Sequence, residues 1–100
     1  MYFTGKPLDA QEAYRIGLFD LVVPHGEELG AAMSLAHTIA AKSPLALRLA
    51  KESLNACEAL AVDEGYEVEQ QYTLRLGQTE DAREAVVAFL EKRPPVWSGR

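Results

Sequence analysis

Features that mark particular classes of protein are scarce in this sequence. Only one of its 100 residues is a cysteine, so no intrachain disulfide can form, and a reducing, cytoplasmic setting is the simplest interpretation. No apolar run approaches the length that spans a bilayer, and the opening stretch MYFTGKPLDA lacks the charged-then-apolar layout of a signal peptide. We therefore expect no membrane partner.

Positive charge is also scarce. Lys and Arg total 10 against 15 Asp and Glu, which gives a net charge of −5. Because phosphate backbones are bound by clustered Lys and Arg, this balance argues against nucleic acid as the main partner. The cations Lys92, Arg93 and Arg100 do gather near the C-terminus, so a small anionic ligand remains a candidate there.

Motifs of nucleophilic, phosphate-cradling and zinc chemistry are missing, since the sequence has no Gly-x-Ser-x-Gly, glycine-rich phosphate loop or His-Glu-x-x-His. We predict no catalytic residue, no metal ligand and no cofactor of the chain's own. His25 and His37 could titrate near neutrality but are interpreted as structural or solvent-facing, and Cys57 as a small core residue. The carboxylates between Asp63 and Glu69 are interpreted as a solvated acidic face; acid–base or cation chemistry there would need a surrounding pocket.

The residues that are present predict one small domain of ordinary composition, 48% hydrophobic and 25% charged. Its start predicts a short βαβ unit. Residues 2–4 favour a strand, Asp9 and Glu12 have the capping-box spacing of a helix start, Gly17 ends that helix, and residues 18–24 favour a second strand. Two strands alone are marginal, so we expect them to join a larger sheet.

The remainder, from Glu27 onward, predicts about four helices, so the fold class is mainly α with a short βαβ start. Ser43 caps one helix, residues 59–76 form a long one that Gly77 ends, and Thr79 caps the last. The apolar positions of the last three helices are Leu45 and Leu49 with Leu47, Ala50, Leu54 and Cys57; Gly65, Val68, Tyr72 and Leu76; and Ala82, Val86, Phe89 and Leu90. This apolar surface exceeds what one helical layer can cover, so we expect covering partners and poor stability as a monomer.

The last helix, in TEDAREAVVAFLEKRPP, ends in the charges of residues 91–93. Pro94 and Pro95 are predicted to stop it, because proline cannot donate a backbone hydrogen bond. Lys92 would interact favourably with the helix dipole, which is a sufficient reason for a lysine there. It would equally suit a phosphate, as a compact ammonium on a rigid helix end. The residues alone do not decide between these roles.

Three stretches resemble the crotonase superfamily, the enoyl-CoA hydratase/isomerase family. FTGKPLDAQEAYRIGLFDLVVP matches the pattern T-G-x-x-x-x-A-x-E-A-x-x-x-G-L-V-x-x-V-V-P, with Phe19 where Val is usual. IAAKSPLALRLAKESLN matches S-P-x-A-x-x-x-x-K, and TEDAREAVVAFLEKR matches T-E-D-x-x-E-G-x-x-A-F-x-E-K-R, with Ala85 in place of Gly. The three lie in order over essentially the whole chain.

The resemblance implies a fold and a division of labour. Residues 1–26 would be the last turn of the crotonase-type spiral core, and residues 27–100 the helical region that builds a trimer, or a hexamer of two trimers, and caps the CoA site. In this family the oxyanion-hole segments and catalytic glutamates belong to earlier spiral turns, to which no part of this chain aligns.

Two site residues follow from the same resemblance. Lys92 occupies the lysine of the E-K-R signature, which reaches the CoA phosphates in a neighbouring subunit. Tyr72 falls near the aromatic that touches the adenine, although its stripe spacing fits a core role equally well. The expected partners are acyl-CoA, as substrate, and either further copies of the chain or the N-terminal spiral domain.

The leading hypothesis is the C-terminal part of an enoyl-CoA hydratase/isomerase enzyme, truncated or begun at an internal Met1, that supplies oligomer contacts and part of a CoA site but is inactive alone. The alternative is a non-catalytic helical assembly or interaction module of the same ancestry. A third option is that these residues are one part of a longer protein with the full spiral. None of these fixes the acyl group or the choice between hydratase, isomerase and hydrolase.

Overall fold

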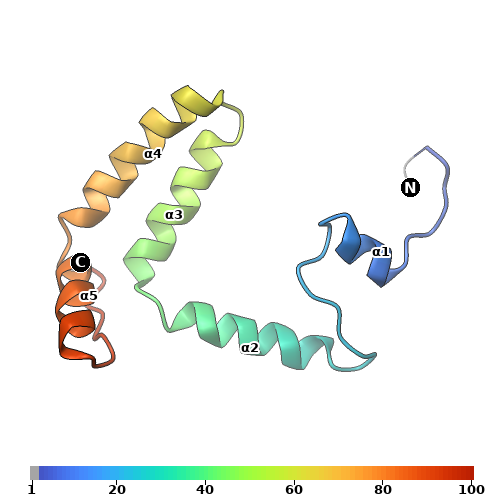
Figure 1. Ribbon diagram of the computed structural model, residues 1–100, viewed down its shortest axis with the longest axis horizontal. Coiled ribbons are helices and arrows are strands. Elements are labelled where there is room, and N and C mark those ends of the chain that lie inside the picture. The colour runs from blue at the N-terminus through green and yellow to red at the C-terminus, as the bar shows by residue number, and fades with distance from the viewer. Residues whose placement is uncertain (1–2) are drawn as a thin grey trace. The chain divides into compact units, whose positions relative to one another are not determined.

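The computed structural model describes residues 3–100, and these form five helices (Figure 1). The helices are α1 (Ala10–Arg15), α2 (Glu28–Ala40), α3 (Pro44–Cys57), α4 (Val62–Gly77) and α5 (Glu80–Glu91). The chain divides into two compact units, residues 1–37 and 38–100. The prediction of a mainly helical fold is confirmed.

The predicted βαβ start is wrong for the residues that can be compared. Phe3 and Thr4 lie in a turn, residues 18–24 form no strand, and no strand occurs anywhere in residues 3–100. Tyr2, the first residue of the predicted first strand, lies outside the described part. A strand is defined by ladder hydrogen bonds to a neighbour, and the β-favouring run at 18–24 has no such neighbour in the described chain.

The first unit is organised around α1. Asp9 caps it as predicted, because its carboxylate accepts the Glu12 N–H at 2.8 Å. The reciprocal half of the predicted capping box is wrong: the Glu12 carboxylate instead pairs with Arg15, one turn further along, at 2.6 Å. A charge-assisted pair between two side chains at this helical spacing is the stronger alternative. Gly17, at φ 77°, ends the helix as predicted.

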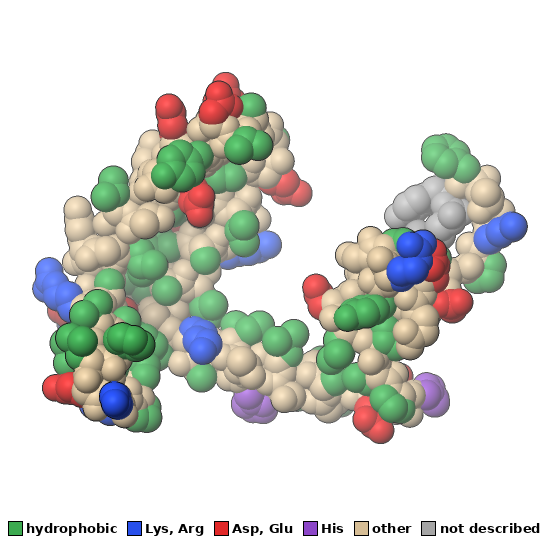
Figure 2. All heavy atoms as spheres, viewed as in Figure 1, with side chains coloured by type: hydrophobic (Ala, Val, Ile, Leu, Met, Phe, Trp, Pro, Cys, Tyr) green, Lys and Arg blue, Asp and Glu red, His purple; other side chains and the backbone are tan. Residues whose placement is uncertain are grey.

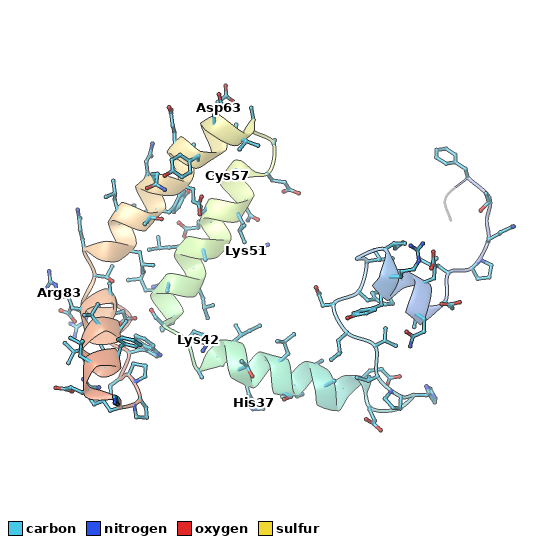
Figure 3. The ribbon with its side chains drawn as sticks, viewed as in Figure 1. His37, Lys42, Lys51, Cys57, Asp63 and Arg83 are labelled. Carbon is cyan, nitrogen blue, oxygen red and sulfur yellow. The ribbon has the colours of Figure 1, made fainter. Side chains whose placement is uncertain are left out.

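The second unit is built on α3 and α4, which lie side by side and antiparallel (Figure 1). Cys57 and Asp63 lie on either side of the turn that joins them (Figure 3). Ser43 caps α3 by accepting the Ala46 N–H at 3.1 Å, as predicted. Leu49, 5% exposed, is the best-buried large apolar side chain of this unit.

The predicted apolar stripes of α3 and α4 differ in how far they are buried. All four stripe positions of α4, residues 65, 68, 72 and 76, are half-buried. On α3 the Leu45–Leu49 stripe faces inward, whereas Leu47 and Leu54 of the other stripe are exposed. One α3 stripe is thus covered within the unit, and the other is open except at its last position, the half-buried Cys57.

The fifth helix buries its small and polar side chains rather than its large apolar ones. Asp81 and Ala88 are buried, whereas Phe89 is 82% and Leu90 72% exposed. Apolar side chains accordingly lie on the surface over α5 (Figure 2). Contiguous exposed apolar side chains mark surfaces that another molecule or segment covers.

Candidate functional site

The C-terminal end of α5 has an unusual backbone. The helix ends at Glu91, with Lys92 as its C-cap and Pro94 two residues beyond, so it stops before the two prolines as predicted. Lys92 takes the left-handed conformation, φ 55° and ψ 38°, and is the only residue other than glycine with positive φ in the described chain. Its N–H donates to the Phe89 carbonyl at 3.3 Å, and the Arg93 N–H to that of Ala88 at 3.0 Å. This left-handed turn, usually made by glycine, satisfies the last helical carbonyls.

The Arg93 guanidinium is paired with two carboxylates. It donates to both oxygens of Glu84, at 2.6 and 2.9 Å, and to Glu91 at 2.6 Å. The hydrogen bond from Arg93 is the main reason that the pKa of Glu84 falls to about 2, helped by the Val96 N–H. The same contacts raise the pKa of Arg93 above its ordinary value. Two of the three charges at the helix end therefore neutralise each other.

Lys92 is left as the available cation of this cluster. Its side chain is exposed, and it forms no ion pair within residues 3–100. An ammonium held on a helix end, with its neighbours already paired, can meet a phosphate as a point charge.

The segment that follows, residues 94–100, is here called the C-terminal strap. It folds back along α5 and is tied to buried Asp81, which is 1% exposed. The Asp81 carboxylate accepts hydrogen bonds from the Ser43 hydroxyl, from the N–H groups of Ser98 (2.8 Å) and Gly99 (3.0 Å), and from the Ser98 hydroxyl (3.1 Å). The Ser43 hydrogen bond is the first cause of the lowered pKa of Asp81. One carboxylate thus joins the start of α3, the start of α5 and the strap.

Further contacts fix the strap at both ends. The Val96 N–H donates to Glu84 at 2.7 Å, and the Trp97 indole N–H donates to the Ala41 carbonyl at 2.9 Å. At the end of the chain the Arg100 carbonyl accepts the Asp81 N–H at 3.0 Å. The Lys92 turn therefore lies between α5 and an anchored strap.

Tyr72 lies elsewhere in the same unit. It is half-buried and lines a shallow groove of about 150 Å³ between α3 and α4, together with Leu49, Ser53 and Leu76. The Arg75 guanidinium sits 5.5 Å from its ring centroid, within cation–π range. Lys92 does not line this groove, so the two predicted site residues do not share one pocket in this chain. Their roles stay predictions.

The first unit has the larger hollow, about 400 Å³. Its walls are mainly aliphatic, from residues 18–23 and from Ala31, Ala32 and Leu35 on α2, with the carboxylates of Asp20 and Glu28 at the wall. It contains no basic group, so it suits apolar rather than anionic contents.

The other side chains considered from the sequence form no reactive constellation. His25 is exposed with its Nδ1 3.6 Å from Glu28, and His37, on α2 in Figure 3, is exposed with its Nδ1 2.7 Å from the Met33 carbonyl. Cys57 is half-buried and donates to the Gly65 carbonyl at 3.2 Å. Among residues 3–100, no group of three His, Cys, Asp or Glu side chains is arranged to hold a metal ion.

Two anchors were missed by reasoning from the sequence. Asp81 lies in the first turn of α5, where the helix dipole alone is a sufficient reason for an acidic residue, and the sequence gives Glu84 no role. A usable signal existed for Asp81: Thr79 already caps the helix, so a second acceptor in the first turn is free to bind another segment. No local pattern links Glu84 to Arg93, because the pair closes only through the left-handed turn.

Comparison with known proteins gives a consistent result. The family model for enoyl-CoA hydratase/isomerase matches residues 1–100. Among curated proteins, the chain is 40% identical over 104 residues to a carnitinyl-CoA dehydratase of Proteus mirabilis and 39% identical over 100 residues to a 2,3-dehydroadipyl-CoA hydratase of Escherichia coli. Both alignments include 100% of this chain but only 40% and 39% of the relatives.

Solved structures agree. A provisionally named enoyl-CoA hydratase/isomerase of Mycobacterium abscessus superposes with a TM-score of 0.91 at 43% identity, over 97% of this chain and 40% of that one. An enoyl-CoA hydratase of Mycobacterium tuberculosis gives 0.88 at 31% identity, over 97% and 38%. No helix within residues 3–100 is long and apolar enough to span a membrane.

Proposed function

The chain belongs to the enoyl-CoA hydratase/isomerase family, and we propose that it supplies the helical, CoA-gripping and assembly part of such an enzyme. It spans about two-fifths of the length of its curated relatives. Under this proposal it corresponds to the C-terminal part of the family fold and binds acyl-CoA thioesters without performing the chemistry alone. The names of the relatives all specify a CoA thioester but differ in the acyl group. We therefore propose acyl-CoA thioesters as the ligand class and no particular acyl group.

The observation that carries the proposal is the free ammonium of Lys92. Its two charged neighbours, Glu91 and Arg93, are paired with each other at 2.6 Å. An anionic ligand at this helix end would therefore be met by Lys92. Phosphate is the anion that CoA offers in this role whatever the acyl group, since the thioester itself is uncharged.

Calorimetric titration of CoA into the protein, in its assembled form, tests whether Lys92 binds a CoA phosphate. We expect binding that weakens as salt is raised, because a charged contact is screened. Lys92→Ala should weaken binding by about tenfold or more, the equivalent of a hydrogen bond to a charged group. Lys51→Ala, which removes a lysine from α3, is the matched control and should bind as the parent does. Equal affinities for the parent and Lys92→Ala would contradict the proposal.

Catalysis is tested separately, by following hydration of crotonyl-CoA through the loss of enone absorbance. We expect no turnover by the chain alone and turnover once the remaining family segments are supplied. General acid–base chemistry beside an oxyanion hole would be the task of those segments. Turnover by the chain alone would contradict the assignment of the chemistry to them.

Assembly is the second part of the proposal. The exposed stripe of α5, with Phe89 and Leu90, runs up to Lys92, so a partner that covers the stripe would also lie beside the ammonium. We propose that this partner is a further copy of the chain, in a trimer or hexamer, or the N-terminal spiral domain. Sedimentation velocity distinguishes these, and a compact, stable monomer would contradict both.

Tyr72 is proposed to contact the adenine. Its ring is half-buried in the α3–α4 groove, and the guanidinium of Arg75 lies over it. Tyr72→Leu should weaken CoA binding and leave binding of phosphopantetheine, which lacks the adenine, unchanged. Equal losses for both ligands would assign Tyr72 to the core instead.

The same exposed stripe favours a second candidate, a non-catalytic assembly module that no longer binds CoA. An assembled protein that shows no heat of CoA binding at any salt concentration would support it over the first.

A further inference from the structure

The left-handed turn at Lys92 needs an explanation, because this backbone conformation raises the free energy of any residue that has a Cβ. The cost is about 1–2 kcal/mol relative to the right-handed region, and such residues persist only where the surroundings fix them. Lys92 is the one non-glycine residue of the described chain that takes it. Some contact must therefore hold the turn.

Two backbone hydrogen bonds close the turn, from the Lys92 and Arg93 N–H groups to the last turn of α5, and the Glu84–Arg93 ion pair adds a side-chain contact across it. The chain enters the turn from α5 and leaves it through Arg93, whose guanidinium is bound to both oxygens of Glu84 on the same helix. Glu84 also accepts the Val96 N–H at 2.7 Å, so the strap is fixed on the far side of Pro94 and Pro95 as well. Lys92 is thus held between a helix and an anchored segment.

The pair has an electrostatic consequence too. Glu84 and Glu91 are the carboxylates bound at this helix end, and each is taken up by Arg93. Without Arg93, either carboxylate could turn to the Lys92 ammonium and neutralise it. Arg93 therefore keeps the ammonium unpaired and available to an outside anion.

We propose that Glu84 and Arg93 are positioning residues that hold Lys92 in its left-handed conformation and keep its ammonium free for a ligand phosphate. This inference rests on the proposed function of Lys92 and adds residues that would not touch the ligand. It also explains why the charged end of α5 contains an arginine that is already paired with carboxylates of the same chain.

The variant Glu84→Gln distinguishes a role in positioning Lys92 from a purely electrostatic effect of the Glu84 charge on the ligand phosphate. Removing a carboxylate close to a phosphate site should tighten anion binding if only Coulomb attraction matters. Positioning predicts the opposite sign, because a smaller fraction of molecules then presents Lys92 correctly and the apparent Kd rises in proportion. We expect CoA binding to weaken about threefold to tenfold. Glu67→Gln makes the same charge change on exposed α4 and should leave the affinity at or slightly above that of the parent.

Arg93→Lys is the second variant, and it leaves the net charge unchanged. A lysine cannot make the two-pronged contact with Glu84, so the turn should loosen and CoA binding should weaken by a similar factor. Far-UV circular dichroism checks that each variant folds, and the result for Arg93→Lys decides the matter if Glu84→Gln does not. All titrations use the full chain in its assembled form.

The coupling to Lys92 completes the test. In a Lys92→Ala background, Glu84→Gln should cause no further loss, since there is no ammonium left to position. A full additional loss in that background, or unchanged or tighter binding by Glu84→Gln and Arg93→Lys, would overturn the inference while the grip by Lys92 stands. If Lys92→Ala binds CoA like the parent, the proposed function itself fails, and this inference fails with it.

Discussion

Replacing Lys92 by glycine should make the protein more stable and a poorer CoA binder. Glycine adopts the left-handed region without the Cβ clash that costs other residues about 1–2 kcal/mol. Glycine also gives the unfolded chain more freedom, which offsets about 0.5–1 kcal/mol of that gain. The expected net effect at φ 55° is therefore a rise of about 0.5–1 kcal/mol in the free energy of unfolding.

Lys92→Ala is the matched control. Alanine removes the ammonium but keeps the Cβ, so the strain remains and stability should stay within about 0.5 kcal/mol of the parent. Both variants should lose CoA binding equally. The comparison separates the backbone cost of the turn from the charge that it presents.

Urea unfolding at fixed protein concentration measures the difference, with equal m-values as the check that only stability changed. For a chain of 100 residues the gain from glycine corresponds to a rise in Tm of about 2–8 °C. A glycine variant that is no more stable than the alanine variant would refute the claim that the turn is strained. A glycine variant that binds CoA like the parent would refute the role of the ammonium.

Four other outcomes are expected. Asp81→Asn should release the strap, because an amide cannot accept all the donors that the carboxylate binds, and the emission of Trp97, the single tryptophan, should shift to the red. Acidification should loosen the strap in the same assay: the pKa of Glu84 lies near 2 in the folded chain and 4.5 is its ordinary value, so its stabilising contribution is complete above pH 4.5 and is lost as the pH falls towards about 2. Leu49→Ala should lower the free energy of unfolding by about 2–5 kcal/mol in urea titrations, because Leu49 is buried. Phe89→Ser should shift sedimentation towards smaller species, since this 82% exposed side chain would otherwise be covered on assembly; an unchanged distribution would remove α5 from the interface.

Helix starts were predictable because each depends on one side chain and one nearby N–H. Asp9, Ser43 and Thr79 all cap as expected, each accepting a hydrogen bond three residues further along. The half-buried face of α4 followed from helical spacing in the same way. These are local properties, and neither requires knowledge of what else is present.

The strand prediction failed for the complementary reason. Residues 18–24 have β-favouring side chains, but a strand exists only when another strand accepts its hydrogen bonds. The described chain offers none, and the apolar side chains of this segment instead line the hollow beside α2. The β propensity of residues 18–24 depends on that segment alone, whereas a strand also requires a second segment that pairs with it.

The end of α5 shows why the candidate site was only partly predictable. Lys92 was identified by its place in the E-K-R signature, but the signature gives no reason why that lysine rather than the adjacent arginine should meet a ligand. The reason that we propose is a contact across nine residues, from Glu84 to Arg93, which forms only after the chain reverses at Lys92. The residue that would act on the ligand therefore also makes the turn that brings its neighbour back onto the helix, and the neighbour in return leaves the ammonium unpaired. Under this proposal, the Lys92 ammonium is unpaired because of the backbone geometry of the turn. Composition and residue spacing do not reveal that geometry, so the sequence alone could not decide the role of Lys92.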